Sequence, residues 1–248
     1  MRTVIVIPAR YASTRLPGKP LLSESGKPLI CHVVEQAMKC SSAAAVVVAT
    51  DDERIQQIVE AAGSTAVMTR PDHPSGTDRI AEAVAGLEAD IVVNLQGDEP
   101  QFDPAGVDLL VGLLVGDPVA NMSTLAAPIR DLDTYNNPSC VKVVADGHGR
   151  ALYFSRSPVP YVRDGVPDFA DDPPQFLLHV GVYAYRRDYL LKLAATPPHP
   201  LEQLEKLEQL RALGTGGVIR VGIIPHAHRG IDTPADYAAF VEAVRGRR

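Results

Sequence analysis

Runs of β-branched and other apolar residues alternate with stretches of helical periodicity along the first half of the chain. The predicted strands lie at residues 4–7, 45–49 and 91–95, and the predicted helices at 29–38, 53–62, 78–87 and 104–114. Strands that are apolar throughout are typical of a parallel sheet whose two faces are covered by helices. The pattern therefore predicts an α/β fold with βαβ connections.

The pattern changes after about residue 119, where shorter strands surround a loop rich in proline and aspartate. This part predicts a lobe inserted into the α/β domain. We expect one domain of residues 1–118 plus 215–248 and a second one of residues 119–214. The further elements expected are strands at 141–145, 179–186 and 218–224, a helix at 201–213 and a closing helix that begins at about 234.

Composition excludes several classes of protein. Of the 248 residues, 46% are apolar and 22% are charged, and the formal net charge is −6. These values exclude a disordered or fibrous chain, and the net acidity argues against nucleic acid as a partner. The longest apolar run, 109–115, is far below the roughly 20 residues that span a bilayer. The first residues hold no signal-peptide core and the three cysteines lack disulfide or metal spacing, so we expect a cytoplasmic location.

The first predicted strand leads into a loop with an excess of positive charge. Arg10, Arg15 and Lys19 lie here, at the carboxyl end of that strand. Such a loop could surround a triphosphate. The residue types alone leave a phosphate-binding loop and a solvated basic loop about equally favoured. Neither a Walker motif nor a dinucleotide-binding glycine fingerprint is present.

Two aspartates are candidate metal ligands. Asp98 comes just after the strand at 91–95, and Asp232 comes just before the closing helix. Mg²⁺ needs few protein carboxylates, because water and phosphate oxygens complete its shell. However, spacing alone favours a turn role for Asp98 and Glu99, and Asp232 or Thr233 could be the cap of the closing helix.

The strand at 179–186 carries a third candidate group. His179 alternates with Tyr183 and Tyr185, so the three side chains share one face of the sheet. That face could bind a hydroxylated ligand, or His179 could be a core histidine with an internal hydrogen bond. The sequence leaves both interpretations open.

Eight motifs occur in order along nearly the whole chain. They are IPARYASTRLPGKPL at 7–21, ATDD at 49–52, MTRPDHPSGTDR at 68–79, VNLQGDEP at 93–100, ALYFSR at 151–156, HVGVYAYR at 179–186, LEQLR at 207–211 and GIDTPAD at 230–236. Together they resemble the CMP-KDO synthetases, which are 3-deoxy-manno-octulosonate (KDO) cytidylyltransferases. The resemblance implies a Rossmann-like, mostly parallel sheet flanked by helices, of the nucleotide-diphospho-sugar transferase type. It also implies a smaller mixed-sheet lobe that binds the sugar and forms a homodimer.

The resemblance further implies a reaction and a set of site residues. The anomeric hydroxyl of KDO would attack the α-phosphate of CTP, giving CMP-KDO and pyrophosphate for lipopolysaccharide synthesis, with Mg²⁺ as cofactor. The triphosphate would be held by Arg10, Arg15 and Lys19. The nucleotide would also face Ser75, Gly76, Arg79 and Gln96, and the metal would be ligated by Asp98 and Asp232. The sugar acid would face Gln96, Arg156, His179, Tyr183, Glu208 and Gln209, with Arg156 matching its carboxylate.

Other functions remain as alternatives. The acceptor could be amino-KDO or sialic acid, since the same nucleotide domain could serve either. The protein could instead be a catalytically silent CTP-binding regulator, although the expected carboxylates and Lys19 are all present. A dehydrogenase is disfavoured because the glycine fingerprint is missing.

Overall fold

The structure is a computed structural model that describes residues 1–12, 16–227 and 230–246. It divides into two compact units, Met1–Asp108 with His228–Arg248 and Leu109–Ala227. The boundaries differ from those expected at 118 and 214, because the strand Ile219–Ile223 pairs with a strand of the second unit. Within the described stretches, no helix is both long and apolar enough to cross a membrane.

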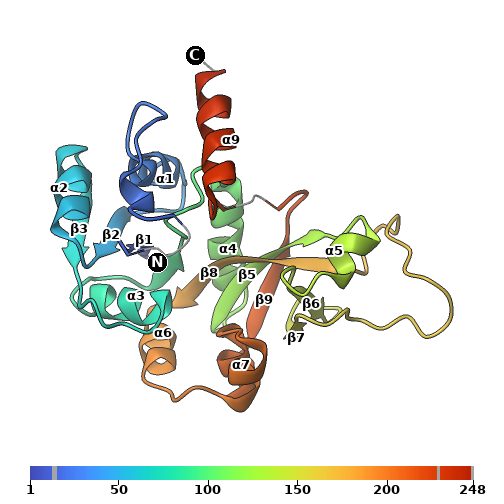
Figure 1. Cartoon of the computed structure of the whole chain (residues 1–248). Coiled ribbons are helices and arrows are strands. Elements are labelled where there is room, and N and C mark those ends of the chain that lie inside the picture. Colours follow the sequence, from blue (N-terminus) through green and yellow to red (C-terminus); the bar gives the residue numbers. More distant parts are fainter. Residues whose placement is uncertain (13–15, 228–229, 247–248) are drawn as a thin grey trace. The chain divides into compact units, whose positions relative to one another are not determined.

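The first unit contains parallel strands in the order β3-β2-β1-β4. The strands are β1 (Thr3–Ala9), β2 (Ala45–Thr50), β3 (Thr65–Met68) and β4 (Ile91–Asn94). The helices are η1 (Lys19–Leu21), α1 (Leu29–Ala37), α2 (Glu53–Ala61), α3 (Gly76–Ala85) and α9 (Pro234–Arg245). In Figure 1, α1 and α3 lie on opposite sides of the strands, as a parallel sheet with both faces covered requires. The predicted α/β fold is confirmed, and the observed ends of its elements lie close to the expected ones.

The C-terminal helix α9 belongs to the first unit through its apolar face. Tyr237, Phe240 and Val241 form a buried cluster with Leu16 and Leu29. Thr233, and not Asp232, is the N-cap of α9, because its side chain accepts a hydrogen bond from the backbone nitrogen of Asp236. Of the two predicted caps, the structure therefore selects Thr233.

The second unit is a mixed sheet with short helices. β5 (Met122–Pro128) lies between an antiparallel β8 (Leu177–Arg186) and a parallel β9 (Ile219–Ile223). β6 (Lys142–Ala145) pairs with β7 (Ala151–Ser155) and with β8. The helices are α5 (Leu132–Asn136), α6 (Arg187–Ala194), α7 (Pro200–Glu205) and α8 (Gln209–Gly214), and α4 (Pro104–Gly116) carries the chain into this unit from the first.

The prediction of a single helix at 201–213 is wrong. The chain forms α7 and α8 instead, and between them Lys206 adopts a left-handed conformation with φ 53°. The turn allows Arg211 of α8 to bind both carboxylate oxygens of Glu202 in α7, at 2.8 and 2.5 Å. It also buries Leu207, which is 7% exposed.

Candidate active site

The carboxyl ends of parallel strands bring distant segments of the first unit to one edge of its sheet. Ala9 at the end of β1 pairs with Thr50 at the end of β2, and Val6 pairs with Asn94 at the end of β4. Beyond these ends the chain continues into Arg10, Asp51 and Asp98. Open α/β sheets bind their ligands at this edge.

Gly97 lets the turn after β4 pass close to the end of β1. A Cβ atom at this position would lie 2.8 Å from the carbonyl oxygen of Pro8, which is too close for any side chain. The same turn lies beside the segment that precedes α9, because the backbone nitrogen of Ile231 donates to the carbonyl of Asp98 at 2.8 Å. The two aspartates predicted as metal ligands, Asp98 and Asp232, are brought together in this way.

Lys19 lies between these two aspartates. Its Nζ donates to Asp98 Oδ2 at 2.6 Å, to the Ile231 carbonyl at 2.9 Å and to Asp232 Oδ1 at 3.5 Å. The Lys19 side chain is only 15% exposed. Carboxylate and carbonyl oxygens therefore surround one cation, which here is the lysine ammonium group.

The oxygen atoms around Lys19 are of the kind that Mg²⁺ prefers. No group of three or more His, Cys, Asp or Glu that could hold a metal occurs among the described residues. A metal bound by Asp98 and Asp232 would therefore take its remaining ligands from water and phosphate, as Mg²⁺ commonly does. Burial and the neighbouring Asp98 charge raise the pKa of Glu99 to about 8, which keeps that carboxyl largely neutral at pH 7.

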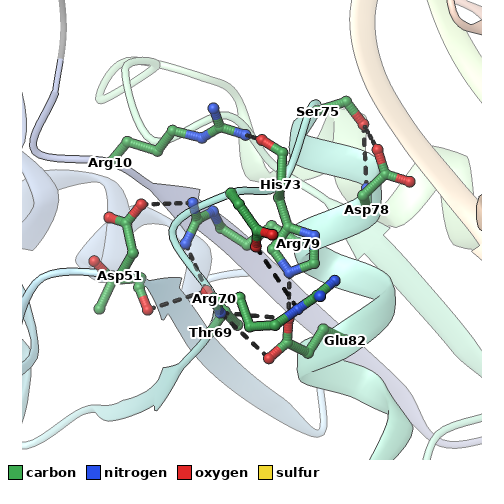
Figure 2. A network of polar contacts seen from close by, with 11 residues as sticks. Arg10, Asp51, Thr69, Arg70, His73, Ser75, Asp78, Arg79 and Glu82 are labelled. Carbon is green, nitrogen blue, oxygen red and sulfur yellow. Dashed lines mark hydrogen bonds and ion pairs between the residues drawn. The ribbon is translucent and has the colours of Figure 1, made fainter.

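The N-terminus of α3 lies at the same edge. Ser75 is its N-cap, and the Ser75 Oγ accepts from the backbone nitrogen of Asp78 at 3.2 Å and donates to the Asp78 carboxylate at 2.7 Å (Figure 2). Gly76 follows, and a Cβ atom there would lie 3.6 Å from the side chain of Pro8 at the end of β1. Helix N-termini attract phosphate groups, because their first amides and their dipole favour negative charge.

Arg79 lies in the first turns of α3, four residues after the N-cap Ser75. Its Nη2 binds Asp51 at 2.7 Å and its Nη1 donates to Thr69 Oγ1 at 2.5 Å (Figure 2), and the residue is 0% exposed. A completely buried side chain does not face a ligand, so the direct nucleotide contact expected of Arg79 needs correction. Arg79 instead ties α3 to the segments that follow β2 and β3.

The remaining residues expected at the nucleotide are placed as follows. Arg10 is half-buried, and its Nη2 donates to the carbonyl of His73 at 2.6 Å. Gln96 lies in the turn after β4, and its Nε2 donates to Asn94 Oδ1 at 3.3 Å. Arg15 lies outside the described residues.

In the second unit, His179 is a neutral histidine with an internal partner. Its Nε2 lies 3.0 Å from Thr124 Oγ1, and burial lowers the pKa of His179 to about 3. The Thr124 hydroxyl has acceptors in the carbonyls of Val180 and Val182 at 3.1 and 2.9 Å. If its single proton goes to one of these carbonyls, Nε2 of His179 is the donor and Nδ1 is the acceptor nitrogen.

Aromatic rings surround His179 on the predicted face of β8. The ring centroids of Phe154 and Tyr183 lie 4.9 and 5.5 Å from that of His179, and Tyr183 and Tyr185 are 5.9 Å apart. Burial also raises the pKa of the Tyr183 hydroxyl, which stays protonated. This part of β8 is a neutral, apolar surface with hydroxyl and imidazole groups.

Arg156 contacts backbone carbonyls in this structure. Its Nε donates to Glu205 at 2.6 Å, its Nη1 to Pro138 at 2.9 Å and its Nη2 to Lys206 at 3.5 Å. Carbonyls do not neutralise a guanidinium, so its positive charge remains available to an anion. Three of its N–H groups are nevertheless engaged in joining loops of the second unit.

The helix turn that follows Lys206 places two further expected residues. Glu208 is exposed, while Gln209 begins α8 and is 5% exposed. The Nε2 of Gln209 is buried with no hydrogen-bond partner in the described part of the chain. An unsatisfied buried amide is costly, and a ligand oxygen is one group that would satisfy it.

Lys142 is a buried residue that the sequence analysis did not single out. It is 0% exposed, and its Nζ donates to the carbonyls of Asn137, Cys140 and Arg156 at 3.0, 2.6 and 2.6 Å. Burial lowers the pKa of this amine. In the sequence, Lys142 differs from its neighbours only as a lysine within an apolar strand. This pattern indicates neither the function of Lys142 nor the groups that it contacts.

Comparison with known proteins shows the family of the chain. The model of the cytidylyltransferase family matches residues 4–219, and the chain belongs to this family. The 3-deoxy-manno-octulosonate cytidylyltransferase of Syntrophobacter fumaroxidans is 52% identical over 244 residues, which cover 97% of this chain and 96% of that protein. The enzyme of the same name from Geobacter sulfurreducens is 46% identical over 250 residues, covering 99% of this chain and 100% of the other.

Solved structures give the same result. A CMP:2-keto-3-deoxy-manno-octonic acid synthetase in complex with CTP has a TM-score of 0.93 and 46% sequence identity, with all of both chains covered. A cytidylyltransferase from Leptospira borgpetersenii has a TM-score of 0.64 at 20% identity, covering 99% of this chain and 87% of the other, and this match concerns the fold alone. The expected resemblance to the CMP-KDO synthetases is confirmed.

Proposed function

We propose that the protein joins CTP to KDO, giving CMP-KDO and pyrophosphate. The observation that carries the proposal is the cluster of Lys19, Asp98 and Asp232 at the carboxyl edge of the sheet, in a chain of the cytidylyltransferase family. The similar structure that was solved in complex with CTP supports the choice of nucleotide. The names of the relatives support the choice of sugar acid.

In this reaction, the anomeric oxygen of KDO forms a bond to the α-phosphorus of CTP. The bond from that phosphorus to the oxygen bridging it to the β-phosphate breaks, and pyrophosphate leaves with the electron pair while the hydroxyl proton passes to solvent. The chain's contribution is to position the reactants and to offset charge. Arg10, Arg15 and Lys19 would bind the triphosphate, and Ser75 and Gly76 would present the N-terminus of α3 to the nucleotide.

Asp98 and Asp232 would hold Mg²⁺ in this reaction. The oxygen donors that now surround Lys19 suit this ion. When bound, Mg²⁺ offsets negative charge on phosphate oxygens and lowers the pKa of a nearby hydroxyl. Lys19 would then move its ammonium group from the carboxylates to the phosphates.

The second unit would recognise the sugar acid. Arg156 carries the charge that suits a carboxylate, and the neutral His179, Tyr183 and Gln209 offer hydrogen-bonding groups to hydroxyls. Glu208 and Gln96 complete the proposed contacts. CMP-KDO so formed would serve lipopolysaccharide synthesis, and the enzyme would act in the cytoplasm.

A homodimer is also part of the proposal. The second unit leaves the apolar side chains of Leu152, Leu201 and Leu204 exposed, at 60%, 37% and 80%. Subunit interfaces commonly cover such side chains. Analytical ultracentrifugation of the purified protein tests this point, and a monomer at micromolar concentration would contradict it.

The experiment for the proposed function is an assay of pyrophosphate release from CTP with different acceptors. Purified protein and Mg²⁺ are combined with KDO, amino-KDO, sialic acid or no acceptor. We expect release with KDO above all others and none without an acceptor. Preferred release with amino-KDO or sialic acid would change the substrate, and CTP binding without release would favour a regulator.

A further inference from the structure

One carboxylate holds the segment before α3 against that helix. Glu82 of α3 accepts hydrogen bonds from the backbone nitrogen of Arg70 at 3.3 Å and lies in contact with Nε2 of the His73 ring (Figure 2). The Arg70 side chain adds an ion pair at 3.5 Å. Desolvation opposes ionisation of Glu82, but the hydrogen bonds from His73 and Arg70 prevail and lower its pKa. Both ends of the segment 70–73 are thereby fixed.

The backbone of His73 in turn holds Arg10. The carbonyl oxygen of His73 accepts from Arg10 Nη2 at 2.6 Å, across 63 positions of sequence. The His73 side chain is only 4% exposed, so its ring fills the space beneath the segment and cannot itself reach a ligand. A carbonyl fixes the direction of a guanidinium without cancelling its charge, which leaves that charge available to an anion.

We propose that His73 and Glu82 are positioning residues that orient Arg10 toward the triphosphate of CTP. This inference rests on the proposed function, since it takes CTP as the anion. Glu82 fixes the His73 ring, the ring fixes the His73 carbonyl, and the carbonyl fixes Arg10. Orienting a charged side chain before the ligand arrives lowers the entropic cost of binding.

The test is a double-mutant cycle on the CTP dissociation constant. Isothermal titration calorimetry with the full chain, Mg²⁺ and CTP compares the wild-type protein with Arg10→Ala, Glu82→Ala and the double variant. We expect each single variant to bind CTP about tenfold more weakly, the loss expected for one charge-assisted contact. We expect the double variant to bind no more weakly than Arg10→Ala alone, because Glu82 acts through Arg10.

A conservative variant and a matched control separate positioning from general damage. Glu82→Gln keeps an oxygen that accepts hydrogen bonds, so it should recover most of the CTP affinity. Glu88→Ala removes an exposed glutamate three residues beyond the end of α3 and should leave CTP binding unchanged. In steady-state assays, Glu82→Ala should raise KM for CTP and leave KM for KDO unchanged.

Several results would overturn the inference. They are unchanged CTP affinity in Glu82→Ala or in Arg10→Ala, and additive losses in the double variant. If thermal denaturation shows that Glu82→Ala does not fold, the same cycle with His73→Gln decides. Failure of the proposed function would be distinct, since the wild-type protein and Glu88→Ala would then release no pyrophosphate from CTP in the presence of KDO, whereas failure of this inference leaves that release intact.

Discussion

The ammonium group of Lys19 lies 2.6 Å from the carboxylate of Asp98, a residue 79 positions later in the chain. It also lies 3.5 Å from Asp232. The single positive charge of Lys19 thus offsets part of the negative charge of the two carboxylates that are proposed to hold Mg²⁺. A metal held by these carboxylates would compete with Lys19 for the same oxygens, and a bound triphosphate would offer Lys19 other anionic partners.

Removing Lys19 should affect metal and nucleotide in opposite directions. In Lys19→Met, the protein without nucleotide should bind Mn²⁺, a spectroscopic substitute for Mg²⁺, about tenfold more tightly, because no ammonium group has to be displaced. KM for CTP should rise by about tenfold, since one phosphate contact is lost, while the preference among sugar acids stays the same. Electron paramagnetic resonance and pyrophosphate assays measure these effects. Mn²⁺ affinity that is unchanged or weaker would show that Lys19 does not compete with the metal.

Gly97 should tolerate no side chain. Gly97→Ala places a Cβ atom 2.8 Å from the Pro8 carbonyl, so the turn that carries Asp98 has to move. We expect the free energy of unfolding to fall by about 1–3 kcal/mol. We expect turnover to fall by a larger fraction of its wild-type value than the free energy of unfolding does. Urea denaturation followed by circular dichroism and the pyrophosphate assay measure the two effects.

Gly86→Ala is the matched control for that substitution. Nothing lies within 4 Å of a Cβ atom at Gly86, which follows α3. Its stability and turnover should stay close to those of the wild-type protein. Equal behaviour of the two alanine variants would contradict the role given to Gly97.

The half-buried His179 should make the protein less stable in acid. Burial lowers the pKa of His179 to about 3 in the folded state, while the unfolded chain has its ordinary pKa of about 6.5. Between these values the unfolded state binds the proton and the folded state does not. The contribution of His179 to the free energy of unfolding therefore falls as pH falls, by at most about 1.4 kcal/mol per pH unit.

His179→Gln removes this titration. The difference in free energy of unfolding between the wild-type protein and the variant should shrink as pH falls from about 6.5 toward 4. Urea denaturation at several pH values gives the difference. Parallel curves for the two proteins would show that His179 is protonated as readily when folded as when unfolded.

The periodic pattern predicted most of the first unit because its helices are periodic and its central strands are apolar throughout. It missed the four-residue strand β3, whose residues are exposed or only half-buried. It did not predict the break at Lys206, since a left-handed turn is usually marked by glycine or asparagine and here is a lysine. That turn is stabilised by the pairing of Glu202 with Arg211, a contact between helices that periodicity does not record.

The candidate site was predicted in part. The resemblance singled out Lys19, Asp98 and Asp232, and the structure brings these three together. It also singled out Arg79, which the structure places in a buried ion pair with Asp51. Residue type alone does not reveal which side of a helix faces a ligand, so this burial could not be predicted. The positioning role proposed for Glu82 rests on its contacts with Arg70 and His73, which the sequence pattern does not reveal.

The most direct test of the central claim is formation of CMP-KDO by the wild-type protein and by Asp98→Asn, with Asp188→Asn as control. The control removes a carboxylate that is 98% exposed. Mass spectrometry follows the product from saturating CTP and KDO with Mg²⁺ and after addition of EDTA. We predict that the wild-type and control proteins form product only in the presence of Mg²⁺. We predict that Asp98→Asn folds and that its rate is reduced at least about a hundredfold. A near-normal rate with Asp98→Asn, or product formation that persists in EDTA, would contradict the account.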